Sequence, residues 1–173
     1  SKMPKFILYP RIIKDFESCT STPKIILGNF IRRIVDGSNF SQAEVTLSTI
    51  YLKKYADGGN IITKSNINIL FAISLYLATK WLEDYDLNII QIARLFGVTK
   101  DEIIDLESEF LHRVNWKLFV SENEFNYKVE YYNNIYEKLK STNSFYKTKK
   151  DRYVFIIESE MKKLIHRNRF CCF

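Results

Sequence analysis

The sequence has few of the residues from which catalytic and metal sites are built. Its histidines are only two, His112 and His166, and its three cysteines are Cys19, Cys171 and Cys172. None of these residues stands at the spacing of a metal site. The motifs GxGxxG, GxxxxGK[ST], HExxH and GxSxG are also missing. We therefore expect no enzyme here: no catalytic residue, no metal, no cofactor and no small-molecule substrate.

Helix breakers and long apolar runs are scarce as well. Three prolines and five glycines among 173 residues leave room for long helices. The longest apolar stretch, Ile67 to Ala78, is interrupted by Asn68 and Ser74. It is shorter than the ~20 residues that span a bilayer, so we expect no membrane partner. The cysteines form no disulfide framework and no signal peptide is visible, which predicts the cytoplasm or the nucleus.

The excess of positive charge is confined to one part of the chain. The net charge is +6, and residues 138–169 hold ten Lys or Arg against three Asp or Glu, so the rest is close to neutral. A nucleic-acid patch and a solvated helix face are the two interpretations of such a segment. The neutral body favours the second, and we do not expect nucleic acid as a partner.

The spacing of apolar residues predicts an all-α fold in one domain. No stretch alternates as a strand does. Capping boxes, formed by Ser41 with Glu44 and by Thr99 with Glu102, mark the starts of two helices. The third helix is apolar nearly all round, which is typical of the buried centre of a bundle. The expected helices cover residues 24–35, 41–56, 65–84, 89–96, 99–114, 122–140 and 149–167.

Two charged residues continue apolar helical rows. Lys80 lies two turns after Ile73, and Glu107 lies one turn after Ile103. A charge in such a place is costly to desolvate unless a partner is supplied. Either the two residues pair with each other or reach water, or both face a binding partner that completes their hydrogen bonds. Spacing alone favours the first interpretation.

Three segments, in order along the chain, resemble the cyclin box. Residues 77–84 (LATKWLED) are similar to the family's L-A-[ST]-K-[FY]-x-E-[DE] stretch, and residues 104–111 (IDLESEFL) to its fifth-helix signature with a glutamate. Residues 47–54 (LSTIYLKK) fit the second-helix pattern, with Lys53-Lys54 where Asp-Arg is common. The resemblance covers about residues 24–120. Within the family the chain looks most like the P-type cyclins, the fungal phosphate-signalling cyclin and its plant and protozoan relatives.

The resemblance implies a single five-helix cyclin box at residues 23–120, between an N-terminal arm (1–22) and a C-terminal helical extension (121–173). It also implies the role of a regulatory subunit that forms a heterodimer with a cyclin-dependent protein kinase and activates it. The alternatives are a cyclin-fold scaffold and a transcription-factor-like module, neither of which activates a kinase. Whether the kinase serves the cell cycle or phosphate signalling stays open.

The positions that would bind the kinase carry over residue by residue. Lys80 and Glu107 match the positions that contact the αC region of the kinase, where its PSTAIRE-like helix docks. The other carried-over positions are apolar: Leu77, Trp81, Leu111, Trp116 and Leu118. Residues 23–27 (PKIIL) match the substrate-docking M-R-A-I-L patch of mitotic cyclins only in part, so we do not expect docking of basic-x-leucine motifs.

Overall fold

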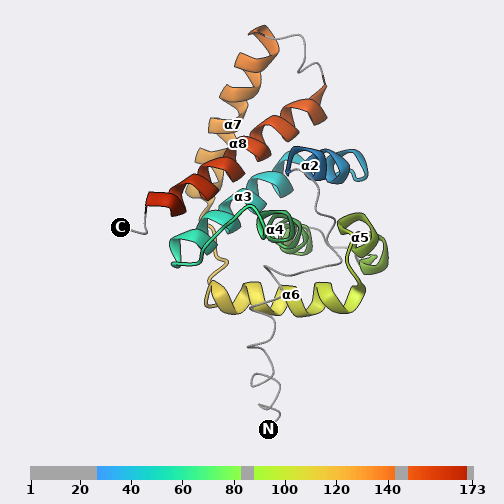
Figure 1. Cartoon of the computed structure of the whole chain (residues 1–173). Coiled ribbons are helices and arrows are strands. Elements are labelled where there is room, and N and C mark those ends of the chain that lie inside the picture. Colours follow the sequence, from blue (N-terminus) through green and yellow to red (C-terminus); the bar gives the residue numbers. More distant parts are fainter. Residues whose placement is uncertain (1–26, 83–87, 143–147, 171–173) are drawn as a thin grey trace.

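The computed structural model describes residues 27–82, 88–142 and 148–170. Over these ranges the chain forms seven helices and no strand (Figure 1), which confirms the all-α class. Among these helices, none has the length and apolar character needed to cross a membrane. The arm at residues 1–22 and the acidic end of the LATKWLED segment lie outside the described residues. The helices are α2 (Leu27–Asp36), α3 (Gln42–Asp57), α4 (Ile67–Leu82), α5 (Ile89–Phe96), α6 (Lys100–Arg113), α7 (Glu122–Thr142) and α8 (Lys149–Phe170).

Both predicted capping boxes are present. At the start of α3, the Ser41 side chain accepts from the Glu44 amide at 3.3 Å, and the Glu44 carboxylate accepts from the Ser41 amide at 2.8 Å. Thr99 and Glu102 exchange the same two bonds at the start of α6, at 3.1 and 2.8 Å. These bonds satisfy amides that a helix start leaves without partners, so the sequence sets where each helix begins.

Helix α4 is the centre of the molecule. Every residue from Ile67 to Thr79 is buried, as the apolar pattern of this segment predicts. Figure 1 looks nearly along α4, with α6 crossing below it; α2, α3, α5 and α6 all pack against it. The arrangement holds the last turn of α4 beside α6, at the edge of this core.

The C-terminal helices belong to the same core as the helices before them. Helix α8 lies across α2 and α3, and α7 packs on α3 and α8 (Figure 1). The buried Tyr132 hydroxyl of α7 donates to Thr49 Oγ1 of α3 at 2.7 Å. The boundary predicted between residues 120 and 121 therefore divides the sequence but not the hydrophobic core. Helix α8 contributes six buried apolar side chains: Tyr153, Val154, Ile156, Ile157, Met161 and Leu164.

Part of the positive charge of α8 is paired with acidic residues of the fold. Lys162 pairs with Glu158 at 3.0 Å and Lys163 with Glu160 at 3.3 Å, both along the helix. Arg167 pairs with Asp57 at the end of α3. These pairs support the interpretation of the basic segment as a solvated helix face.

Candidate functional site

Lys80 and Glu107 meet at the edge of the core. Lys80 lies in the last turn of α4 and Glu107 in the middle of α6, and these two helices pack together. Lys80 Nζ donates to Glu107 Oε1 at 2.6 Å. The Lys80 side chain is 46% exposed and the Glu107 side chain 17%. The expectation that the two charges pair with each other is therefore confirmed for the free protein.

The aromatic ring of Tyr76 completes the surroundings of Lys80. Lys80 Nζ lies 5.3 Å from the ring centroid of Tyr76, one turn earlier on α4, as in a cation–π contact. Partial desolvation acts against the charge of Lys80, but the hydrogen bond and the negative charge of Glu107 outweigh it, so the pKa of Lys80 is raised. Burial, and then the charge of Glu107, raise the pKa of Tyr76. In the sequence, Tyr76 counts as a member of the apolar row that Lys80 continues; its contact with Lys80 was not predicted, although the i, i+4 spacing is the signal that indicates it.

The Lys80 ammonium has hydrogen-bond donors that the ion pair with Glu107 does not use. An ammonium group has three donors, and among the described residues only Glu107 accepts a hydrogen bond from Lys80. Nearly half of the Lys80 side chain faces water, so its remaining donors are open to a partner. Lys80 can therefore pair with Glu107 and still donate to a partner, so the interpretation as an internal pair does not exclude the interpretation as a binding surface.

Large apolar side chains lie exposed on the same two helices. Trp81, next to Lys80, is 73% exposed, and Leu82 after it is also exposed. Ile104, one turn before Glu107 on α6, is exposed as well. Leu82 and Ile104 were missed in the sequence, because an apolar residue at a helical position is most often assigned to the core. Trp81 and Ile104 thus place apolar surface near the charge pair, whereas Leu82, two residues after Lys80, lies about 200° around the axis of α4.

A tight turn after α6 holds another exposed aromatic residue. Asn115 and Trp116 have φ angles of 53° and 60°, in the left-handed region that costs a non-glycine residue energy. The Trp116 amide donates to the Leu111 carbonyl at 2.8 Å, and the His112 ring meets the Trp116 indole edge-on at 5.4 Å. Trp116 is 60% exposed, and Phe119, which sequence reasoning also missed, is 79% exposed. The fold thus keeps aromatic surface in water beside the end of α6.

A match to a known protein family shows to which family the chain belongs. The model "Cyclin, N-terminal domain" matches residues 4–119, which is more than half of the chain. The chain belongs to the cyclin family. Cyclins as a family are non-catalytic regulatory subunits of cyclin-dependent kinases. The membership expected from the three motifs is therefore confirmed.

The curated relatives of this cyclin are distant plant proteins, homologues of the P-type group. Cyclin-U4-1 of Arabidopsis thaliana is 28% identical over 61% of this chain and 54% of its own length. Cyclin-U4-3 and Cyclin-U2-1 of the same plant are 24% and 22% identical, over 48% and 49% of their lengths. The match thus spans about half the length of these relatives. No solved structure matches this cyclin significantly.

The other predicted site residues of this cyclin differ in how far they reach the surface. Trp81 and Trp116 are exposed, while Leu111 and Leu118 are half-buried and pack against the core. Leu77 is buried in that core, so it offers little surface to a partner. In the part of the chain that the structure describes, no cluster of His, Cys, Asp or Glu is arranged to hold a metal ion.

Proposed function

We propose that this cyclin binds a cyclin-dependent protein kinase through the surface around Lys80 and Glu107, and that binding activates the kinase. The single observation that supports this best is a half-exposed ion pair among exposed apolar side chains. Tryptophan is among the residues that most often dominate interface energies, and Trp81 and Trp116 are both largely exposed. Lys80, Glu107, Trp81 and Trp116 make the central contacts in this proposal, with Leu111 and Leu118 at their side.

The ion pair would give the interface its specificity. Burying the surface removes Lys80 and Glu107 from water, which is favourable only where the partner completes their hydrogen bonds. The αC region of a kinase, with its backbone and polar side chains, would supply those bonds in one conformation. Apolar contact around the pair contributes most of the affinity, and the pair rejects surfaces without matching groups.

The proposed mechanism is conformational. A kinase of this class is inactive while its αC helix is displaced, because the catalytic lysine and the αC glutamate must pair to position ATP. A rigid helical surface that binds only the inward αC state shifts the population toward it. The cyclin contributes binding energy, and the kinase performs the chemistry. We place this encounter in the cytoplasm or the nucleus.

The test is a pull-down from native lysate of the source cells with three baits: the wild-type cyclin, Glu107→Ala and Asp105→Ala. Asp105 is exposed on the same helix, about 200° around its axis from Glu107, so it is the matched control. We expect mass spectrometry to find a kinase with the wild type and with Asp105→Ala, but not with Glu107→Ala. The purified kinase should then phosphorylate a generic substrate faster when the cyclin is added.

Two outcomes would point elsewhere. A kinase that binds without a gain in activity indicates the scaffold alternative. Recovery of polymerase subunits or promoter DNA in place of a kinase indicates the transcription-factor-like alternative.

A further inference from the structure

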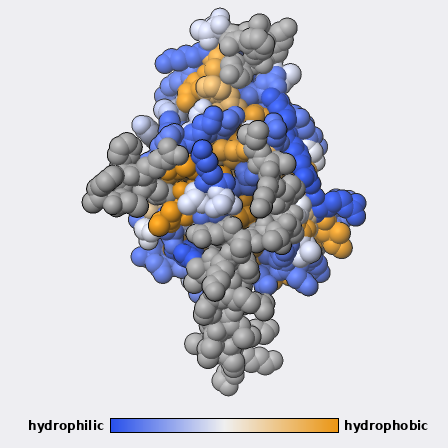
Figure 2. Space-filling model, viewed as in Figure 1, coloured by the Kyte–Doolittle hydropathy of each residue, from blue (hydrophilic) through white to orange (hydrophobic). Residues whose placement is uncertain are grey.

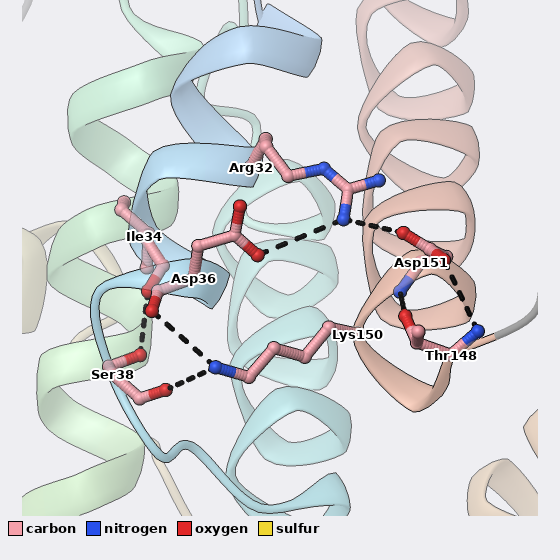
Figure 3. Close-up of polar contacts among 7 residues, drawn as sticks. All are labelled: Arg32, Ile34, Asp36, Ser38, Thr148, Lys150 and Asp151. Carbon is pink, nitrogen blue, oxygen red and sulfur yellow. Dashed lines mark hydrogen bonds and ion pairs between the residues drawn. The ribbon is translucent and has the colours of Figure 1, made fainter.

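The start of α8 is fastened to the end of α2 by a set of polar contacts (Figure 3). Arg32 Nη1 lies 2.7 Å from Asp151 Oδ1 and 3.8 Å from Asp36 Oδ1. Asp151 and Thr148 also cap the helix start for each other, at 3.1 and 3.2 Å. The Lys150 ammonium lies 3.4 Å from two backbone carbonyl oxygens, those of Asp36 and Ser38. The connection from α2 to α3 is therefore held against α8.

A cavity of about 340 Å³ lies beside this junction. Its apolar walls are Val35 near the end of α2, Phe40 in the connection that follows, and Val45 in the first turn of α3. Gln42 lies at its edge, and Lys149 and Lys150 border it from α8. None of its lining residues belongs to α4 or α6, so it is separate from the surface around Lys80 and Glu107.

The two lysines of the cavity have no carboxylate partner among the described residues. The Lys149 ammonium lies 6.0 Å from the Tyr153 ring centroid, and Lys150 contacts only backbone carbonyls. The nearby acids, Asp36 and Asp151, are both directed at Arg32. By contrast, Lys162 and Lys163 on the same helix are each paired with a glutamate. Lys149 and Lys150 thus differ from Lys162 and Lys163, because neither has a carboxylate partner in the described part of the chain.

We propose that this cavity binds an acidic peptide segment of a partner protein. One apolar side chain of the segment enters between Val35, Phe40 and Val45, and carboxylates on either side of it meet Lys149 and Lys150. The apolar walls suit an aliphatic side chain of a peptide, whereas the bases of a nucleic acid bind mainly by stacking on aromatic faces and by hydrogen bonds at their edges. The site would let the cyclin hold a substrate or regulator while its other surface holds the kinase.

The experiment measures binding of a fluorescein-labelled decapeptide with a central leucine flanked by two Asp and two Glu, by fluorescence anisotropy at 100 mM salt. The full chain is used, as wild type and with two double variants. Lys149→Ala with Lys150→Ala removes the proposed contacts. Lys162→Ala with Lys163→Ala removes the same charge from the same helix and is the matched control. Circular dichroism melts establish that each variant is folded.

We expect saturable binding to the wild type, an affinity loss of about tenfold in the first variant and less than twofold in the control. Replacing the leucine by glycine in the peptide should weaken binding, as should replacing its acids by amides. Equal losses in the two variants, or no dependence on the leucine, would show only general attraction to a basic protein and would overturn the proposal. Tighter binding of a single-stranded DNA 12-mer, with the same loss in the first variant, would assign the site to nucleic acid instead. Neither Lys80 nor Glu107 takes part, so this test is independent of kinase binding.

Discussion

Two ion pairs of almost equal length join helices in this cyclin, yet their surroundings differ. Lys80 and Glu107 lie 2.6 Å apart, and Arg32 and Asp151 lie 2.7 Å apart; in each pair the cation is almost half exposed. Asp151 also caps α8, and Arg32 also reaches Asp36. Around Lys80 and Glu107, in contrast, the neighbouring side chains Trp81 and Ile104 are exposed and apolar.

The difference shows how one contact geometry serves two purposes. A pair whose members hold further polar groups of their own chain stabilises the fold. A pair among exposed apolar side chains has its other donors and acceptors free for a second molecule. The distance between the charges does not distinguish a stabilising pair from one that is available to a partner, but the surrounding side chains do.

Exchanging the charges of the first pair should give the largest effect. Lys80→Glu combined with Glu107→Lys can rebuild the internal ion pair, so we expect a thermal melt close to that of the wild type. The kinase would meet reversed charges, and a mismatched, desolvated charge costs about 3–5 kcal/mol. The kinase affinity should therefore fall by roughly two to four orders of magnitude, measured by calorimetric titration. Wild-type affinity in this variant would mean that the pair is only structural.

Replacing Trp116 tests the aromatic surface beside the end of α6. Glycine tolerates the φ of 60° at this position, so Trp116→Gly removes the indole without straining the turn. We expect an unchanged or higher melting temperature, together with a loss of kinase affinity of about 2 kcal/mol, as for a central interface tryptophan. Phe119→Ala is a useful companion variant; if neither substitution weakens binding, the aromatic surface beside α6 is not part of the interface.

The same charge exchange at the second pair should have the opposite pattern. Arg32→Asp with Asp151→Arg restores an ion pair but loses the carboxylate that caps α8, and a lost cap costs about 1 kcal/mol. Loss of the contact with Asp36 adds a few tenths of a kcal/mol. Urea unfolding should show this decrease in the free energy of unfolding, while the kinase affinity stays within twofold. A stability equal to that of the wild type would contradict the structural role.

The smallest effect should depend on pH. The hydrogen bonds from Thr148 and Arg32 lower the pKa of Asp151 in the folded protein. A lowered folded pKa contributes stability above the unfolded value of about 3.9, and that stability is lost as pH falls through the folded value. Asp151→Asn should therefore destabilise the protein by less than about 1 kcal/mol at pH 7, and the difference from wild type should shrink as the pH falls below the unfolded value and through the lowered folded pKa of Asp151. The control is Asp105→Asn, because Asp105 is exposed and has no partner in the described chain. If the difference in the free energy of unfolding between Asp151→Asn and wild type does not change with pH, this explanation is wrong.

The helices and their starts could be predicted because they depend on local chemistry. Ser41 with Glu44 and Thr99 with Glu102 are capping boxes in sequence and in structure, and the apolar pattern of α4 was enough to place it at the centre. Two interrupted apolar rows also singled out Lys80 and Glu107, and their pairing was one of the alternatives that this pattern favoured. These inferences need only the hydrogen bonds of a helix start, the period of a helix and the cost of burying a charge.

Long-range packing could not be predicted in the same way. The charges of α8 indicated that one of its faces is solvated, but nothing in the sequence indicated that the other face fills the core against α2 and α3. The apolar pattern of α4 places Leu77 in the core and the cyclin resemblance places it at the kinase-binding surface, and the sequence alone did not show how little of its side chain reaches that surface. Which side of a row is covered depends on the position of helices distant in the chain.

The distance in sequence between α2 and α8 has a consequence for synthesis of the protein. Arg32 and Asp151 are 119 residues apart, and a ribosome adds roughly 5–20 residues per second. The face of α2 that packs on α8 therefore waits on the order of ten seconds for its cover after it has been made. During that time it is open to chaperones and to other nascent chains. Substitutions that slow the docking of α8 should lower the yield from cells before they lower the melting temperature of the purified protein.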